Sequence, residues 1–221
     1  MTARVALIDS GVNLLHPHVR GAGEIVPGPT VGEGGALDDR RPHEDVLGHG
    51  TAAAAAILDL APGSVLYSIR VFTERAECPF DRVLAALRHA FTWRPRFVNL
   101  SLGTSDERWR EDLLTLAREA EQLGIVIVSP ATHGSLPSLP GSLAGYAGVM
   151  MDARLPRDRP ERRAIGGRTW WFASPYPRDL PNLPRSANLA GVSMAAANLT
   201  GWLAGGGDQG DSTRNPSSRS S

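Results

Sequence analysis

This sequence contains no lysine and a single cysteine, and it lacks both a net charge and a long apolar run. Each of these absences excludes a class of structure or partner. One cysteine, Cys78, excludes an intramolecular disulfide, and no histidine accompanies it in the pattern of a cysteine protease. The 23 basic residues are all arginines and are balanced by 23 acidic residues, so no net charge favours a nucleic acid or an anionic membrane surface. No stretch approaches the roughly 20 apolar residues of a membrane-spanning helix. The first residues also lack a signal-peptide cleavage site, so we expect a cytoplasmic protein with neither a nucleic-acid nor a membrane partner.

The composition is otherwise that of an ordinary globular protein. Its 221 residues, 42% of them hydrophobic, are enough for one domain with a substantial core. We expect this domain to span residues 1–204 and to be followed by a disordered Ser-, Gly- and Arg-rich tail at 205–221. Four acidic residues at 38, 39, 44 and 45 have the spacing of no ion-binding loop, which favours a solvated acidic loop. We therefore expect neither a metal nor a cofactor.

Short apolar runs alternate with amphipathic or alanine-rich segments along the chain. The patterns predict strands at 5–8, 65–72, 97–102, 125–128 and 146–151, and helices at 51–60, 80–93, 107–123 and 192–204. The segment 20–47 is rich in Gly, Pro and charged residues and is predicted to form loops. This alternation indicates an α/β fold with a mainly parallel central sheet and helices on both faces.

Three short motifs, far apart in the sequence, carry reactive side chains. They read Ile-Asp-Ser-Gly at 8–11, Gly-His-Gly-Thr at 48–51 and Gly-Val-Ser-Met-Ala at 191–195. Alone, Asp9 would be explained as an acid that caps a turn at the end of a strand, and Ser193 as the N-cap of a helix. Together and in this order, an acid that orients an imidazole and an imidazole that deprotonates a hydroxyl form a nucleophilic triad.

With the strand Val-Asn-Leu-Ser-Leu-Gly at 98–103, these motifs make the chain resemble the subtilisin-like serine proteases, the subtilase family. The resemblance runs from about residue 4 to 203 and implies a subtilisin-like fold. It also implies that Asp9 orients the histidine, that His49 is the general base and acid, and that Ser193 is the nucleophile. By the same resemblance, Ser101, Leu102 and Gly103 would pair with the extended backbone of a polypeptide substrate as an added strand.

The chain departs from the family pattern at three positions near these motifs. Thr132 stands where the family has an asparagine that donates to the oxyanion, and in subtilisin the loss of that donor costs about 10²–10³ in rate. Ala52 replaces a frequent second histidine, and Asn198 lies where Pro-His is common; we expect little catalytic effect from either. We also expect no propeptide before the first motif, and the 221 residues are fewer than in typical members.

These features predict a serine endopeptidase that works through an acyl-enzyme and is dedicated to one processing task. The chain is similar to small proteases that remove leader peptides from modified peptides, such as those of quinohemoprotein amine dehydrogenase maturation. The expected partners are then a polypeptide substrate, in particular a crosslinked peptide precursor, and the enzyme that modifies it. The alternative is a peptide-binding protein of the same fold, either non-catalytic or activated by a partner.

Overall fold

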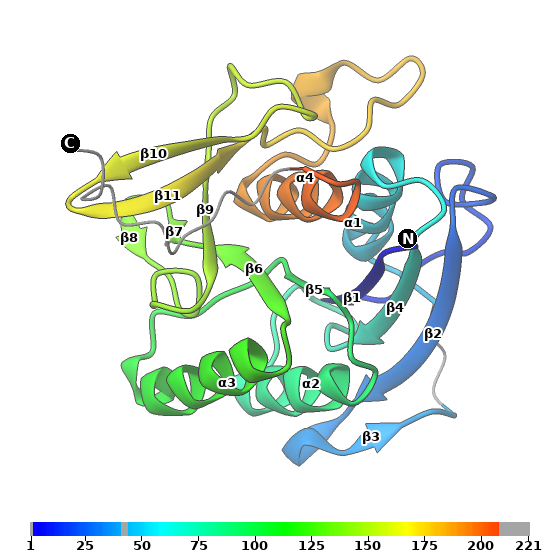
Figure 1. Ribbon diagram of the computed structural model, residues 1–221. Coiled ribbons are helices and arrows are strands. Elements are labelled where there is room, and N and C mark those ends of the chain that lie inside the picture. Colours follow the sequence, from blue (N-terminus) through cyan, green and yellow to red (C-terminus); the bar gives the residue numbers. More distant parts are fainter. Residues whose placement is uncertain (1, 41–43, 208–221) are drawn as a thin grey trace.

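The computed structural model describes residues 2–40 and 44–207, which form a helix–sheet–helix arrangement (Figure 1). The central sheet has nine strands in the order β10-β11-β9-β6-β5-β1-β4-β2-β3. Their bounds are β1 Arg4–Asp9, β2 Glu24–Val31, β3 Leu37–Asp38, β4 Val65–Arg70, β5 Phe97–Leu100, β6 Val126–Pro130, β9 Ala147–Met151, β10 Glu161–Ile165 and β11 Arg168–Ala173. A separate two-stranded hairpin consists of β7 (Thr132–His133) and β8 (Leu136–Pro137).

The strands at the centre of the sheet are parallel and almost completely buried. Strand β1 pairs in parallel with both β4 and β5, and β5 continues the parallel pairing to β6 and β9. In β1, residues Val5 to Ile8 are inaccessible to solvent, because the sheet is covered on both faces. Antiparallel pairs occur only at the two edges among the described strands of this sheet, where β3 joins β2 and β10 joins β11. The predicted fold class, a mainly parallel sheet between helices, is confirmed.

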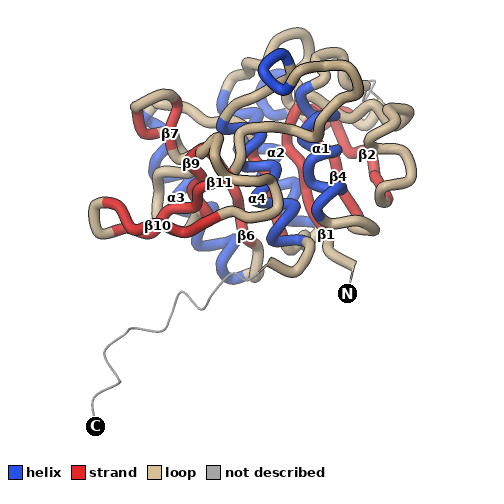
Figure 2. The backbone as a smooth tube through the Cα atoms, turned by 90° about the horizontal axis from the view of Figure 1, so that it is seen from above, coloured by secondary structure: helices blue, strands red, loops and turns tan. Residues whose placement is uncertain are grey.

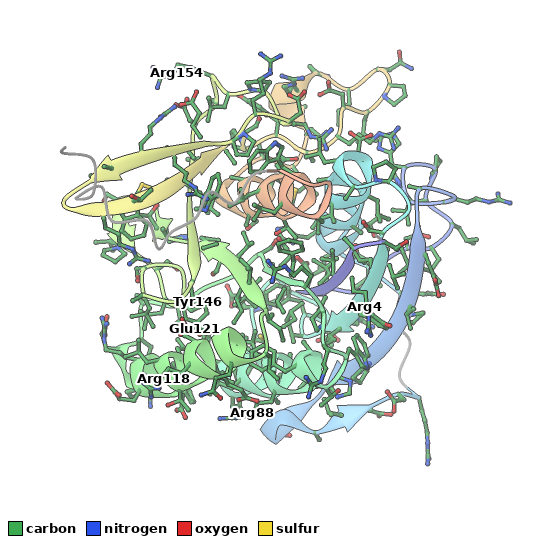
Figure 3. All side chains as sticks on the ribbon, viewed as in Figure 1. Arg4, Arg88, Arg118, Glu121, Tyr146 and Arg154 are labelled. Atoms are coloured by element: carbon green, nitrogen blue, oxygen red, sulfur yellow. The ribbon has the colours of Figure 1, made fainter. Side chains whose placement is uncertain are left out.

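Two helices cover each face of the sheet (Figure 1). Helices α1 (His49–Leu60) and α4 (Val192–Ala204) lie side by side on one face and share a core rich in alanine with β1. Helices α2 (Phe80–Thr92) and α3 (Arg110–Gln122) cover the other face with larger apolar side chains. Tyr146 lies between the sheet and α3 (Figure 3), where its hydroxyl donates to the Leu113 carbonyl oxygen at 2.7 Å.

The reactive motifs gather at one edge of this sheet. In Figure 2, β1 starts beside the N-terminus, and many loops lie at the opposite end of the domain. Asp9 ends β1, His49 begins α1, and Ser193 lies in the first turn of α4. Because ligands of open α/β sheets bind beyond the carboxyl ends of the strands, this edge is where a site is expected.

The structure also contains strands that the sequence patterns did not predict. Segment 20–47, predicted as loops, holds β2 and β3, so that prediction was wrong. The hairpins β7–β8 and β10–β11 were not predicted either. The aromatic run at 170–172 belongs to β11, and the centre of the Trp171 ring lies 5.6 Å from that of Trp202. Most of the tail at 205–221 lies outside the described residues.

Candidate active site

A short hydrogen-bonded pair between Asp9 and His49 forms the centre of the site. The Nδ1 atom of His49 lies 2.8 Å from Asp9 Oδ1 and 3.0 Å from Oδ2. The Asp9 carboxylate is completely buried, and it also accepts a 2.8 Å hydrogen bond from the Ser10 main-chain N–H. Since a carboxylate accepts only, Nδ1 carries the proton, and Nε2 is left with a lone pair for a second partner.

Two glycines allow the chain to place His49 this close to β1. Gly48 has a φ of 77°, a left-handed conformation that glycine adopts without strain, and it turns the chain into α1. Gly50 packs so tightly that a Cβ atom there would lie 2.1 Å from the Gly11 carbonyl oxygen. The turn therefore requires glycine at position 48, and the close approach of the helix to the end of the strand requires glycine at position 50.

A second carboxylate, Asp45, holds the loop that leads to His49. Its Oδ1 accepts hydrogen bonds from the main-chain N–H groups of Leu47 (3.0 Å) and Gly48 (2.9 Å) and from the Ser10 hydroxyl (2.8 Å). Its Oδ2 accepts from the main-chain N–H (2.8 Å) and the hydroxyl (2.6 Å) of Thr51. The interpretation of the acidic residues at 38–45 as a solvated loop missed this role of Asp45, whose partly buried carboxylate is surrounded by five donors.

Ser193 is held against the end of β5 by two reciprocal hydrogen bonds. Its hydroxyl donates to the Ser101 carbonyl oxygen at 3.0 Å, and the Ser101 hydroxyl donates to the Ser193 carbonyl oxygen at 3.3 Å. In this conformation the proton of the Ser193 hydroxyl is directed toward Ser101 rather than toward His49. A rotation about the Cα–Cβ bond of Ser193 would redirect the proton.

A buried polar chain fixes Ser101 and the start of α4. The Asn99 side-chain amide donates to the Ser101 hydroxyl at 2.7 Å and accepts from the Thr200 hydroxyl at 2.9 Å. Asn99 and Thr200 are inaccessible to solvent, so these bonds are protected from competition with water. The sequence interpretation placed residue 99 in the strand beside the cleft and missed this contact, because no sequence pattern pairs residues 99 and 200.

Two cavities meet at Ser193. One, the Thr132 cavity, has a volume of about 370 Å³ and is lined by Ser193, Thr132 and the segment 101–103. The other, the Phe72 cavity, has a volume of about 470 Å³ and is lined by His49, Ser193, Phe72 and the same segment. The structure thus brings Thr132 and the segment 101–103 to the same place as His49 and Ser193.

The electrostatic surroundings of His49 favour its protonated form. Burial lowers the pKa of His49, but the hydrogen bond and charge of Asp9, with a contribution from the charge of Asp45, outweigh it. The net effect is a pKa above the ordinary value of 6.5. A more basic imidazole accepts a proton from a hydroxyl more readily, and the buried Asp9 carboxylate stabilises the cation that results.

The arrangement is suited to acyl transfer from a carbonyl to a hydroxyl. The Ser193 hydroxyl and the His49 imidazole line the same cavity, and the imidazole is hydrogen-bonded to the buried Asp9 carboxylate. The Ser193 N–H lies in the first turn of α4, where main-chain N–H groups lack helical partners and favour a developing negative charge. Within residues 2–40 and 44–207, no group of three or more His, Cys, Asp or Glu side chains is placed to hold a metal ion.

Comparison with known sequences identifies the family. Residues 2–148 match the model of the family described as "Subtilase family", so the chain belongs to the subtilase family, a family of serine endopeptidases. Subtilisin from Bacillus pumilus is 30% identical over 155 residues, which cover 65% of this chain and 51% of that protein. The subtilisin-like protease het-Q2 from Podospora anserina is 37% identical over 105 residues, 43% of this chain and 29% of its own. The chain thus spans about half the length of the first of these relatives.

Solved structures share the fold. A lanthipeptide protease superimposes with a TM-score of 0.67 at 19% identity, covering 91% of this chain and 72% of its own. The prenylagaramide maturation protease PagA gives a TM-score of 0.64 at 17% identity, covering 92% and 74%. At these identities the likeness shows the fold alone. Among the described residues, none of the helices combines the length and apolar character needed to cross a membrane.

Proposed function

We propose that this protein is a serine endopeptidase in which Asp9, His49 and Ser193 form the catalytic triad. The observation that carries the proposal is the hydrogen bond between the buried Asp9 carboxylate and His49 Nδ1, beside a cavity that Ser193 also lines. A binding protein has no need of a buried carboxylate that fixes the tautomer of an imidazole. Membership of the subtilase family supports the same assignment.

The catalytic cycle consists of two acyl transfers. His49 Nε2 takes the proton of the Ser193 hydroxyl as Oγ bonds to the carbonyl carbon of the scissile peptide, and the negative charge moves to the carbonyl oxygen. The Ser193 N–H and the Thr132 side chain stabilise this oxyanion. The C–N bond then breaks, and the leaving amine receives the proton from His49. Water, deprotonated by His49, attacks the acyl carbon; the C–Oγ bond then breaks, Ser193 Oγ takes the proton back from His49, and the peptide product leaves with a new carboxyl group.

The Ser101 carbonyl has two partners in this proposal. It accepts from the Ser193 hydroxyl in the absence of a ligand. The segment 101–103 would pair with the extended backbone of the substrate, whose N–H groups need such carbonyl acceptors. A substrate N–H that replaces the hydroxyl at Ser101 would leave Ser193 free to turn toward His49.

The substrate is a polypeptide, and the proposed task is to remove a leader from a modified peptide or small subunit, such as a crosslinked precursor supplied by its modifying enzyme. Two proteins that share the fold are described as a lanthipeptide protease and a maturation protease, which supports a processing role. The weak oxyanion donor Thr132 is compatible with a slow enzyme that acts on one substrate. A cytoplasmic location remains part of this proposal.

Labelling with a fluorophosphonate tests the reaction. We expect the probe to modify the native protein and Ser64→Ala, in which a serine at the opposite end of the sheet is changed, but not Ser193→Ala. Absence of labelling with and without candidate precursors would refute the enzyme assignment. Labelling that requires a precursor would instead support the alternative, a partner-activated protein, for which the bond between Ser193 and Ser101 provides a structural reason.

A further inference from the structure

A third cavity lies between α1 and the segment that precedes Ser193. Its volume is about 440 Å³, within the usual range of ligand pockets. Its lining includes Gly48 on the His49 loop, Thr51, Ala52 and Ala55 on α1, and Leu189 ahead of Ser193. We call it the Ala52 cavity. We propose that it binds a large apolar side chain of the substrate segment that follows the cleaved bond; this inference rests on the proposed endopeptidase function.

The cavity exists because one face of α1 carries small side chains. Ala52 and Ala55 are three residues apart and therefore share a helix face, and both line the cavity. Ala52 occupies the position where many subtilases have a histidine, so a methyl group stands where a ring would fill space. The departure at this position, from which we expected little catalytic effect, thus leaves room for a ligand.

Exposed leucines contribute to the walls of this cavity. Nine large hydrophobic side chains are exposed among the described residues, and two of them, Leu183 (38% exposed) and Leu189 (45%), line the cavity. Pro177, Leu180 and Ala187 add further apolar lining. Exposed apolar side chains that line a cavity indicate a binding surface.

The charged groups of the cavity already have partners. Asp45 accepts five hydrogen bonds, and Arg178 lies 3.3 Å from Asp59 and also donates to the His18 carbonyl oxygen. Burial and the nearby Arg178 charge lower the pKa of His18, so its ring is neutral near pH 7. The charges of Asp45 and Arg178 are thus already compensated, and the leucines and alanines of the lining fit an apolar occupant.

The position of the Ala52 cavity indicates which part of the substrate it would bind. The Thr132 and Phe72 cavities both contain Ser193 and the segment 101–103, which we assign to the chain before the cleaved bond. The Ala52 cavity contains none of these residues and borders His49 from the other side, through Gly48. Its lining reaches Gly48, which directly precedes His49, and Leu189, four residues before Ser193, so a substrate chain that continues past the reacting residues on this side meets the cavity.

Product analysis with a random peptide mixture tests the inference. The native protein is incubated with the mixture, and the new termini are identified by mass spectrometry. We expect Leu, Ile, Met or Phe to be enriched at least about fivefold at one of the first three positions after the cleaved bond. Ala52→Leu, which fills the cavity, and Leu183→Ser, which makes its rim polar, should reduce this enrichment severalfold.

Two matched variants serve as controls. Ala204→Leu makes the same change in a partly buried residue at the end of α4, and Leu37→Ser changes a leucine of similar exposure (47%, against 38% for Leu183) on β3. Both should keep the native enrichment. Leu183 is exposed, so its replacement keeps the test valid even if Ala52→Leu does not fold.

Reagents that have no peptide segment after the bond that breaks distinguish a failure of the cavity assignment from a failure of the proposed enzyme function. Hydrolysis of 4-nitrophenyl acetate and fluorophosphonate labelling both report Ser193 but involve no residue after the cleaved bond. If all variants retain these reactions while the native protein shows no apolar enrichment, or the enrichment persists in Ala52→Leu and Leu183→Ser, the cavity assignment is wrong and the enzyme assignment stands. If the native protein shows neither reaction, the enzyme assignment itself fails.

Discussion

The Ser10 hydroxyl donates to Asp45 at 2.8 Å and accepts from the Gly50 N–H at 2.9 Å, and these two bonds tie the end of β1 to the loop that carries His49. Ser10 follows Asp9 and Gly50 follows His49, so the bonds couple the two residues of the proposed catalytic pair through their neighbours. Asp45 is thus a positioning residue, since it acts on His49 through the loop.

Asp45→Asn should lower both stability and activity. The NH₂ group of the new amide would replace one carboxylate oxygen and would face groups that are themselves donors. These are either the N–H and hydroxyl of Thr51 or the donors of Ser10 and Gly48. We expect a loss of about 1–3 kcal/mol in the free energy of unfolding, measured with urea, because a buried donor is left unsatisfied. Misplacement of His49 should reduce kcat/KM about tenfold or more. The exposed Asp39→Asn should change neither, and equal effects of the two variants would contradict the positioning role.

The pH profile of kcat/KM should reveal the raised pKa of His49. The base is active only when neutral, so activity should fall as pH decreases through a value above the ordinary 6.5. Asp45→Asn removes one of the charges that raise this pKa, and its acidic limb should move to lower pH. For stability the sign is opposite: the favourable contribution of protonated His49 is complete below the unfolded-state pKa and is lost as pH rises through the folded-state pKa. An acidic limb below pH 6.5 in the native protein would contradict this assignment.

Thr132 provides a test of oxyanion stabilisation. Thr132→Val keeps the shape but removes the hydroxyl, and we expect kcat to fall about 10- to 100-fold, since a hydrogen bond to a charged group contributes about 1.5–3 kcal/mol. Thr132→Asn, which introduces the family's usual donor, should raise kcat. Both are measured with a 4-nitrophenyl ester, together with Thr104→Val, which changes a threonine of the same cavity. Unchanged kcat in both Thr132 variants would show that the side chain does not reach the oxyanion.

Cys78 lines the Phe72 cavity together with His49 but should take no part in the reaction. Burial raises the pKa of its thiol to about 11, so very little thiolate is present near neutral pH. Cys78→Ser should retain fluorophosphonate labelling, and iodoacetamide at pH 7.5 should leave activity nearly unchanged over an hour. Rapid inactivation by iodoacetamide that Cys78→Ser abolishes would show instead that the thiol contributes to the site.

The sequence predicted the fold class because its main elements have strong periodic patterns. Helix α4 begins at Val192 and ends at Ala204, as the apolar run from 192 to 204 predicted. The helix predicted at 107–123 is divided, with a 3-10 turn at Glu107–Trp109 before α3. Strand β2 was missed because its glycine and prolines, which usually mark loops, occur at an irregular part of the pairing with β4.

The candidate site could be predicted only in part. Asp9, His49 and Ser193 stand in distinctive motifs, and the structure brings Asp9 and His49 into contact. Asp45 was misread because a carboxylate beside other acidic residues looks solvated until the turn places main-chain N–H groups around it. No sequence pattern indicated the Ala52 cavity, because it forms where the small side chain of Ala52 leaves space beneath the distant segment 177–189.

The order of the reactive residues along the chain has a consequence for biosynthesis. Ser193 belongs to α4, the last described helix, which packs against α1 and places Ser193 beside Ser101. A chain that emerges from the ribosome from its N-terminus carries Asp9 and His49 long before Ser193, the proposed nucleophile. The proposed reaction therefore cannot begin before α4 has been made and has packed onto the sheet.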